Sequence, residues 1–319
     1  MKGLDVYSSK ILYELDKQSN MPLKALAKKI RRSKQFVLYR IKKLEKEGII
    51  TSYNAIVDMS KLGFFSFRIY FKMRQFTKRD VNEFVDFLKR EFDYIWAITT
   101  MHGMWDIAVF LGIKTIGDLQ IFWDTVLLKY NKHIKEYTVS VYAPIFNFNR
   151  LFTGAKTSEF QTRVYGEGDL VDVDELDWKL IQFYAPNVRA SALEISKTLG
   201  VSADTVRKRI KNLENANVIV GYKIGVNLKK LGYTSYRLDF DLLSTTENKR
   251  LFEFCRQHEK IYQVNNAIGG ANYEIEVLVK DEHELHDLIE DIKDAFADVV
   301  EDIRYFSFST FHQLKYIPD

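Results

Sequence analysis

The spacing of hydrophobic residues changes along the chain from helical to alternating, and this whole order of changes occurs twice. Over about 5–47, apolar residues recur at helical spacing, which predicts short helices with one buried face. Over 67–73, apolar and polar residues alternate, which predicts a strand with one buried face. The segments that begin at Val37 and Val206 align without a gap. Two copies are too few for a solenoid, so we expect each copy to fold as a unit of its own.

The first part of each copy predicts three short helices, the third of them capped. The expected ranges are 5–17, 22–30 and 33–47 in the first copy and 174–185, 191–199 and 202–216 in the second. Ser33 and Ser202 stand where a helix N-cap is expected. Gly200 suits the tight turn before the second cap, whereas the first copy has Arg31 there and must turn without glycine.

The second part of each copy predicts the order β-α-β-β-α-β, which is ferredoxin-like. In the first copy, the elements after the strand at 67–73 are a helix at about 77–91, strands at 94–102 and 105–113, a helix at 115–131 and a strand at 135–144. In the second copy they are a strand at 236–242, a helix at 246–258, strands at 261–268 and 273–280, a helix at 282–297 and a strand at 301–312. Residues 151–170 show no clear period and are interpreted as a linker.

Composition narrows the class of protein. The hydrophobic share of 46% is enough for each domain to bury a core. A single cysteine, Cys255, excludes an internal disulfide and fits a reducing compartment. No apolar run approaches the roughly 20 residues of a membrane-spanning helix, and the first residues lack the apolar core of a signal peptide. These features predict a soluble cytoplasmic protein without a membrane partner, and no metal site or cofactor is expected.

A helix, a tight turn and a capped basic helix together predict a helix-turn-helix in each copy. Val37, Ile41 and Leu44, like Val206, Ile210 and Leu213, form the buried stripe of the third helix. The opposite face is rich in lysine, glutamine and asparagine, which suits contact with phosphates and base edges of double-stranded DNA. The candidate DNA-binding residues are Ser33, Lys34, Gln35, Tyr39, Arg40, Lys42, Lys43, Lys46, Ser202, Asp204, Arg207, Lys208, Lys211 and Asn212.

The two helix-turn-helix modules differ in charge. Residues 22–47 hold ten lysines and arginines against two glutamates, a balance of +8, whereas residues 191–216 hold five against three acids, a balance of +2. Because nonspecific affinity for DNA grows with the number of phosphates neutralised, we expect the first module to supply most of it.

Taken together, these features resemble the Lrp/AsnC family of bacterial and archaeal transcription regulators, present in tandem. The resemblance rests on the LDxxxxKIL-like start at 4–12, on SxxxVxxRIKxLExxxxI at 33–50 and 202–219, and on the Leu-Gly pairs at 62–63 and 231–232. A glycine-acid turn follows within each βαββαβ part, GMWD at 103–106 and GGANYE at 269–274. The sequence departs from the family at Ser8, where the second copy keeps the usual aspartate as Asp177.

The resemblance implies the fold and the partners. The fold class is α+β, with two repeats of a winged helix-turn-helix (1–62 and 171–231), each followed by a ferredoxin-like βαββαβ domain of the kind called RAM (63–150 and 232–319), and with the linker at 151–170 between the repeats. It also implies DNA-binding regulation, homo-oligomers and tuning by a small effector such as an amino acid. The candidate effector residues are His102, Gly103, Met104, Trp105, Asp106, Gly269, Gly270, Asn272 and Glu274.

The sheets themselves indicate an interface. The segment WDIAVFLGI at 105–113 is apolar at both parities, so the first sheet is expected to pack face to face with another. That partner is either the second sheet of the same chain or the counterpart sheet of a second chain, most simply in a homodimer. Glu274 and Glu276 share one parity of the corresponding strand in the second copy, which is therefore expected to be less completely buried.

Two other functions remain open. One is a ligand-sensing or oligomerisation protein whose helix-turn-helix modules no longer bind DNA. The other is an enzyme, because siroheme decarboxylases share this architecture and occur as fused pairs. Those enzymes carry a WPYN-like segment and a Cys-Tyr-Arg-Arg-like stretch, whereas the corresponding region here reads YIWAITTMHGMWDIAV and lacks both. We therefore favour a regulator that is not an enzyme.

Overall fold

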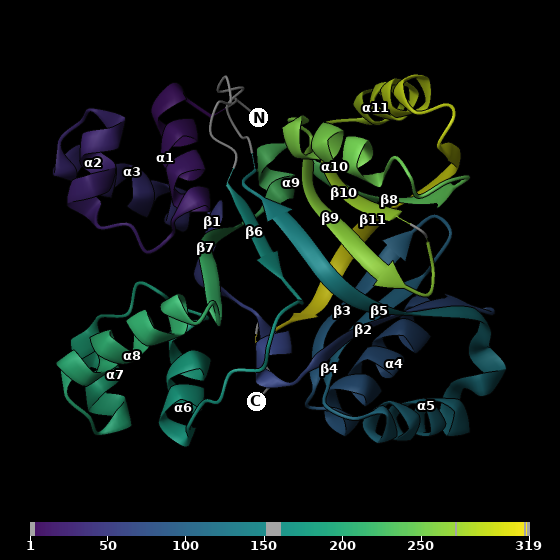
Figure 1. Cartoon of the computed structure of the whole chain (residues 1–319), viewed down its shortest axis with the longest axis horizontal. Coiled ribbons are helices and arrows are strands. Elements are labelled where there is room, and N and C mark those ends of the chain that lie inside the picture. Colours follow the sequence, from purple (N-terminus) through teal and green to yellow (C-terminus); the bar gives the residue numbers. More distant parts are fainter. Residues whose placement is uncertain (1–3, 151–160, 272, 316, 318–319) are drawn as a thin grey trace.

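Three helices open each copy, as the caps and the helical spacing predict. The computed structural model describes residues 4–150, 161–271, 273–315 and 317. The first helical head consists of α1 (Val6–Lys17), α2 (Leu23–Ile30) and α3 (Lys34–Lys46), and the second of α6 (Glu175–Tyr184), α7 (Ala192–Leu199) and α8 (Ala203–Asn215). The two heads lie at one end of the molecule, one above the other in Figure 1.

A two-stranded sheet joins the heads. Strand β1 (Ile50–Val57) follows the first head, β7 (Ile219–Val226) follows the second, and the two strands pair antiparallel. Each head buries a residue of the other copy's strand, since Ile224 belongs to the core of the first head and Ala55 to the core of the second. The spacing of the two heads is therefore fixed within a single chain. We call β1 and β7 the wing sheet.

Two βαββαβ units follow, in the order that the alternation predicts. After the 3₁₀ turn η1 (Met59–Leu62), the first unit contains β2 (Phe65–Met73), α4 (Lys78–Glu91), β3 (Ile95–His102), β4 (Ile107–Ile113), α5 (Ile116–Tyr130), the turn η2 (Asn131–His133) and β5 (Ile134–Phe148). After the short helix α9 (Leu228–Leu231), the second unit contains β8 (Thr234–Leu242), α10 (Asn248–Gln257), β9 (Ile261–Ile268), β10 (Tyr273–Val279), α11 (Glu282–Ala295) and β11 (Val300–Leu314).

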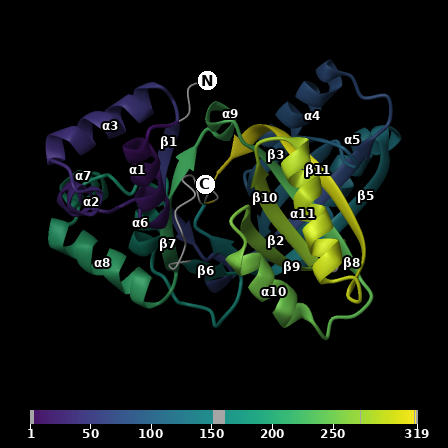
Figure 2. The ribbon, with the colours of Figure 1, turned by 90° about the horizontal axis from the view of Figure 1, so that it is seen from above.

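The two sheets close on each other within the chain. The last strand of each unit reaches across to the other, because β5 pairs with β9 and β11 pairs with β3. With the pairing of β5 to β2, the ladder runs β2-β4-β3-β11-β8-β10-β9-β5 and returns to β2. Helices α4 and α5 cover one outer side of this barrel, and α10 and α11 cover the opposite side (Figures 1 and 2). The sheet-to-sheet contact expected for the doubly apolar strand is thus made inside one chain.

The closure changes three expectations from the sequence. Strands β5 and β11 each span 15 residues, longer than predicted, because each belongs to both sheets. The strand at 67–73 has no exposed face, since Arg68 and Tyr70 point into the barrel and are as buried as their apolar neighbours. The expectation that β10 is less completely buried than β4 is wrong, because the two strands have the same pattern of burial and Glu274 of β10 is fully buried.

The segment interpreted as a linker contains a strand. Within 151–170, residues 151–160 lie outside the described part of the chain. Thr162–Tyr165 forms β6, which pairs with the far end of β5. With four residues, β6 is too short to show an alternating pattern in the sequence. Its pairing also depends on the extension of β5 beyond the predicted end.

Candidate nucleic-acid interface

Helix α3 is positioned by a cap and by an unusual turn. The Ser33 hydroxyl accepts a hydrogen bond from the backbone N–H of Phe36 at 3.2 Å, as predicted for an N-cap. The turn before it is made by Arg31, whose φ of 57° is left-handed, whereas the second copy places Gly200 there with a φ of 68°. The first head therefore turns without glycine, and Arg31 carries the steric cost of that conformation.

The inner stripe of α3 packs into the first head, and the opposite face is exposed to solvent. Val37, Ile41 and Leu44 are buried. The exposed residues include most of the predicted contacts, namely Ser33, Lys34, Gln35, Tyr39, Lys42, Lys43 and Lys46. The equivalent exposed residues of the second head are Ser202, Asp204, Arg207, Lys208, Lys211 and Asn212, while Ile210 of its inner stripe is half-buried.

Two arginines in the predicted set have partners within the heads. Arg40 donates from Nη1 to Asp5 Oδ2 at 2.7 Å, which ties α3 to the N-cap of α1. The equivalent bond in the second head runs from Arg209 to Asp174, also at 2.7 Å. Arg207 pairs with Asp204 one turn earlier on α8, so part of the positive charge of that face is cancelled locally.

The C-terminal ends of α3 and α8 are anchored to the wing sheet by the same contact. Tyr53 on β1 donates its hydroxyl to Glu45 at 2.6 Å, and Tyr222 on β7 donates to Glu214. Burial, together with these carboxylates, raises the pKa of both tyrosines. Because β1 and β7 are paired, the wing sheet sets the relative orientation of α3 and α8.

The first candidate effector turn packs against the other copy. It runs from His102 to Asp106, and Asp106 Oδ1 accepts from Lys72 Nζ at 3.1 Å. Trp105 is buried against Tyr70, and Gly103 adopts a φ of 120°. A Cβ on Gly103 would lie 3.1 Å from Cβ of Phe306 on β11, a tight contact, so both this approach and its φ favour glycine. The remaining residue of this turn, Met104, is half-buried.

The second turn makes the matching contact with β5. Gly269 and Gly270 both have a positive φ, and a Cβ on Gly269 would lie 2.4 Å from the carbonyl oxygen of Val139. Asn272 lies outside the described residues. Glu274 belongs to β10 rather than to the turn, and the structure places it inside the barrel, apart from the glycines.

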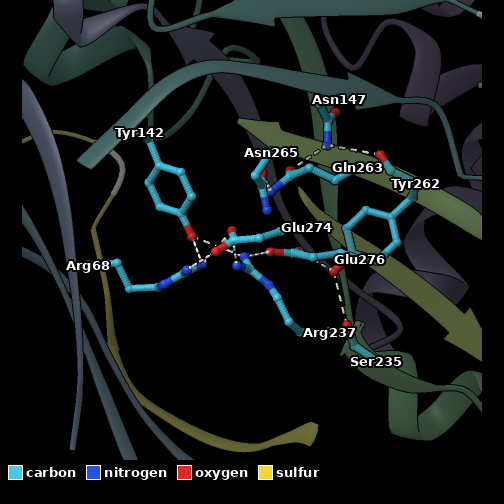
Figure 3. A network of polar contacts seen from close by, with 10 residues as sticks. All are labelled: Arg68, Tyr142, Asn147, Ser235, Arg237, Tyr262, Gln263, Asn265, Glu274 and Glu276. Carbon is cyan, nitrogen blue, oxygen red and sulfur yellow. Dashed lines mark hydrogen bonds and ion pairs between the residues drawn. The ribbon is translucent and has the colours of Figure 1, made fainter. Parts of the chain in front are cut away.

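Glu274 is the centre of a buried ionic network that sequence reasoning did not find (Figure 3). Arg68 on β2 donates from Nη1 to Glu274 Oε2 at 3.0 Å, and Arg237 on β8 binds the same carboxylate. Arg237 also donates to Glu276 Oε1 at 2.7 Å and to the Tyr142 hydroxyl at 3.0 Å. The sequence does carry a signal, because Arg68 and Arg237 occupy the same position in the two copies. The alternating pattern assigned both arginines to the polar, solvent-facing side of a strand with one buried face. The network links both sheets through one carboxylate of the second copy.

Comparisons with known proteins cover both heads. An AsnC-type helix-turn-helix domain matches residues 173–214, and a winged helix-turn-helix DNA-binding family matches residues 4–51. The proline dehydrogenase transcriptional activator of Rhizobium radiobacter is 32% identical over 113 residues, which are 34% of this chain and 72% of that protein. The chain belongs to the Lrp/AsnC family. The HTH-type transcriptional regulator LrpA of Pyrococcus horikoshii is 36% identical to this Lrp/AsnC chain over 91 residues. The match covers 27% of this chain and 64% of LrpA, so the chain spans just under two thirds of the length of that relative.

Two solved structures of one protein match the Lrp/AsnC chain over nearly its whole length. The siroheme decarboxylase NirDL, in complex with an iron-uroporphyrin III analogue, superposes with a TM-score of 0.65 at 15% identity and covers 98% of this chain and 94% of its own. At this identity the likeness shows a common fold alone. None of the helices in the described ranges combines the length and hydrophobicity that a membrane span requires.

Proposed function

We propose that this Lrp/AsnC-family chain binds double-stranded DNA through α3 and α8 and regulates transcription. The observation that carries the proposal is the wing sheet, which holds two capped helices with exposed polar faces in a fixed relation within one chain. Paired recognition helices at a set spacing are the means by which helix-turn-helix dimers read two half-sites. Because the two helices differ in sequence, the target is not required to be a palindrome.

The two helices contribute unequally to this binding. Helix α3 exposes four lysines, Lys34, Lys42, Lys43 and Lys46, and Gln35 near its start. Helix α8 exposes Lys208 and Lys211, but its first turn carries Asp204. The lysines of α3 supply contacts with phosphates, and Gln35 supplies a contact with a base edge, since an amide pairs with adenine through two hydrogen bonds.

A salt titration of matched double variants tests the proposal. Fragments selected by the protein from its own genome serve as the DNA, and affinity is followed by fluorescence anisotropy. Lys42→Ala/Lys43→Ala is expected to weaken binding to all sequences and to lower the salt slope by about one per lost contact, whereas Lys208→Ala/Lys211→Ala costs less. Gln35→Ala changes base preference instead. Equal losses in both double variants would show that charge does not decide which head anchors the DNA.

Absence of binding at low salt would favour a sensing or oligomerisation protein with inactive heads. The enzyme alternative has a separate test, since a purified protein with a tetrapyrrole absorption band would support it. The small effector, such as an amino acid, and the homo-oligomer stay predictions. The covering of the sheets that suggested a dimer is already achieved inside the chain, so an oligomer would require a further surface.

A further inference from the structure

A cavity of about 460 Å³ lies where the wing sheet meets one end of the barrel. Strands β1 and β7 form one side of its wall, and residues from the barrel strands form the other, among them Tyr142, Tyr262 and Glu276 of the network in Figure 3. Its volume is in the range that holds a small molecule, and barrel mouths are common places for such sites. None of the described candidate DNA-binding and effector residues lines this cavity.

The side of the cavity nearest the first head is positively charged. Lys223 on β7 and Arg150 after β5 line it, and Arg163 on β6 lies close behind Gly221. Arg150 binds Asp16 with its Nη2 2.6 Å from Oδ1, and Arg163 is buried and donates to Asn147 Oδ1 at 2.9 Å. Burial, with repulsion from Arg150 and Arg163, lowers the pKa of Lys223 to about 8 despite the attraction of Asp16 and Glu276. Three cations, Lys223, Arg150 and Arg163, therefore lie near the carboxylate of Asp16.

The other two carboxylates in the wall already accept hydrogen bonds from the protein. Glu276 Oε1 accepts from Arg237, and its Oε2 accepts from the Tyr262 hydroxyl at 2.6 Å. Asp58 Oδ1 accepts from the backbone N–H groups of Ser60 and Gly166, at 3.1 and 3.0 Å. Glu276 attracts Lys223 and so offsets part of the positive charge on this side of the cavity, and both acids disfavour a ligand with several negative charges.

The remaining wall is aromatic and partly open to solvent. Trp96, Phe110 and Phe308 line it, and Phe311 and Leu314 at the end of β11 are both about half exposed. Apolar side chains that stay accessible around a cavity are typical of a wall that a ligand covers. The indole of Trp96 packs against Gly112, and its N–H is buried without a hydrogen-bond partner among the described residues.

We infer that this cavity binds a small monocarboxylic acid with an aromatic or otherwise apolar body. Its carboxylate pairs with Lys223 beside Arg150, and its body packs on the aromatic wall. Because the wall contains residues from both copies and from the wing sheet, an occupant contacts the element that orients α3 and α8. The inference does not depend on the proposed function, since ligand binding is measured without DNA.

The test is isothermal titration calorimetry of the intact chain with benzoate, phenylacetate, 1-naphthoate and indole-3-acetate, and with indole-3-acetamide as the neutral match of the last. Saturable binding of at least one acid is expected, with the amide at least about 10-fold weaker, the factor that 1.4 kcal/mol of charge pairing represents. Lys223→Met should weaken the acid by about the same factor, and Lys223→Arg should retain it. Lys249→Met, on the exposed side of α10, is the matched control and should bind as the unchanged protein does.

Three results would overturn the inference. The first is the absence of binding by all four acids at millimolar concentration while circular dichroism shows a folded protein. The second is equal affinity for the acid and its amide, or an unchanged affinity in Lys223→Met. The third is tighter binding of inorganic phosphate than of any carboxylate, which would mark a general anion site. Loss of DNA binding in a separate assay bears on none of these results.

Discussion

Glu274→Gln is expected to be among the most destabilising single substitutions in the barrel. The carboxylate is fully buried and is shared by Arg68 and Arg237, which are each 1% exposed. Without its charge, two guanidinium groups remain buried, and among the described residues the acids beside them are Glu276 and Asp239. Removing one member of a buried ion pair costs about 3–5 kcal/mol, and glutamine keeps an acceptor, so we expect a loss near 3 kcal/mol. This is a large part of the 5–15 kcal/mol that typically stabilises a folded protein.

The assay is urea unfolding followed by tryptophan fluorescence, because Trp96 and Trp105 both lie on the barrel. The matched control is Glu253→Gln on α10, whose partner Arg256 is at the surface. An exposed pair contributes less than about 1 kcal/mol, so this variant should unfold almost as the unchanged protein does. A loss for Glu274→Gln no larger than that of the control would refute the view that the network holds the two sheets together.

Three further predictions concern stability. Arg31→Gly should stabilise the first head by about 1 kcal/mol, and Gly200→Arg should destabilise the second by a similar amount, because the backbone is left-handed at both positions. In thermal melts, the first variant should raise the melting temperature and the second should lower it. Burial, opposed by Arg237 and supported by Glu274, raises the pKa of Asp239 from 3.8 to about 6. The free-energy cost of the ionised Asp239 in the folded protein is therefore complete above pH 6 and disappears below pH 4. Asp239→Asn should be more stable than the unchanged protein by about 3 kcal/mol at pH 7 but not at pH 4. The pKa of Lys223 is lowered instead, from 10.5 to about 8, so the unfolded chain binds this proton more strongly and stability rises between pH 8 and 10.5. Lys223→Met should therefore be about 3 kcal/mol more stable than the unchanged protein at pH 7, and this gain should disappear by pH 10.5. Thermal melts of both proteins at the two pH values measure the difference.

The local structure was predictable because its causes are local. Capping side chains and apolar spacing fixed the ends of α3 and α8 to within a residue or two, and the structure confirms the capped start at Ser33 and Ser202. The order of strands and helices in each unit also follows from periodicity alone. The left-handed turn at Arg31 could be inferred by comparison with Gly200, since two copies of one turn share a backbone conformation.

The barrel interior was not predictable from the same pattern. Alternation of Phe67 and Arg68 indicates one apolar and one polar side, but it does not say whether the polar side faces water or another sheet. Only the pairing of β5 with β9 and of β11 with β3 encloses that side, and such pairing joins residues more than a hundred positions apart. The glycines of the two turns had a second role for the same reason, since Gly103 and Gly269 accommodate strands of the other copy.

The asymmetries of the chain depend on its duplication. In a symmetric dimer, one residue type must serve at both positions related by the two-fold axis. Here Asn54 faces Lys223 across the wing sheet, and both occupy the same place in their own copies. The same holds in the barrel, where Ala108 of β4 pairs with Tyr70 of β2 while Glu274 of β10 pairs with Asp239 of β8. A symmetric dimer of the second half would hold Glu274 and Glu276 twice, so four glutamates would meet two arginines where this chain has two of each. A half-buried lysine at the cavity and a central glutamate in the network, each present in one copy and replaced in the other, are thus arrangements that a fused chain permits and a symmetric dimer of either half would not.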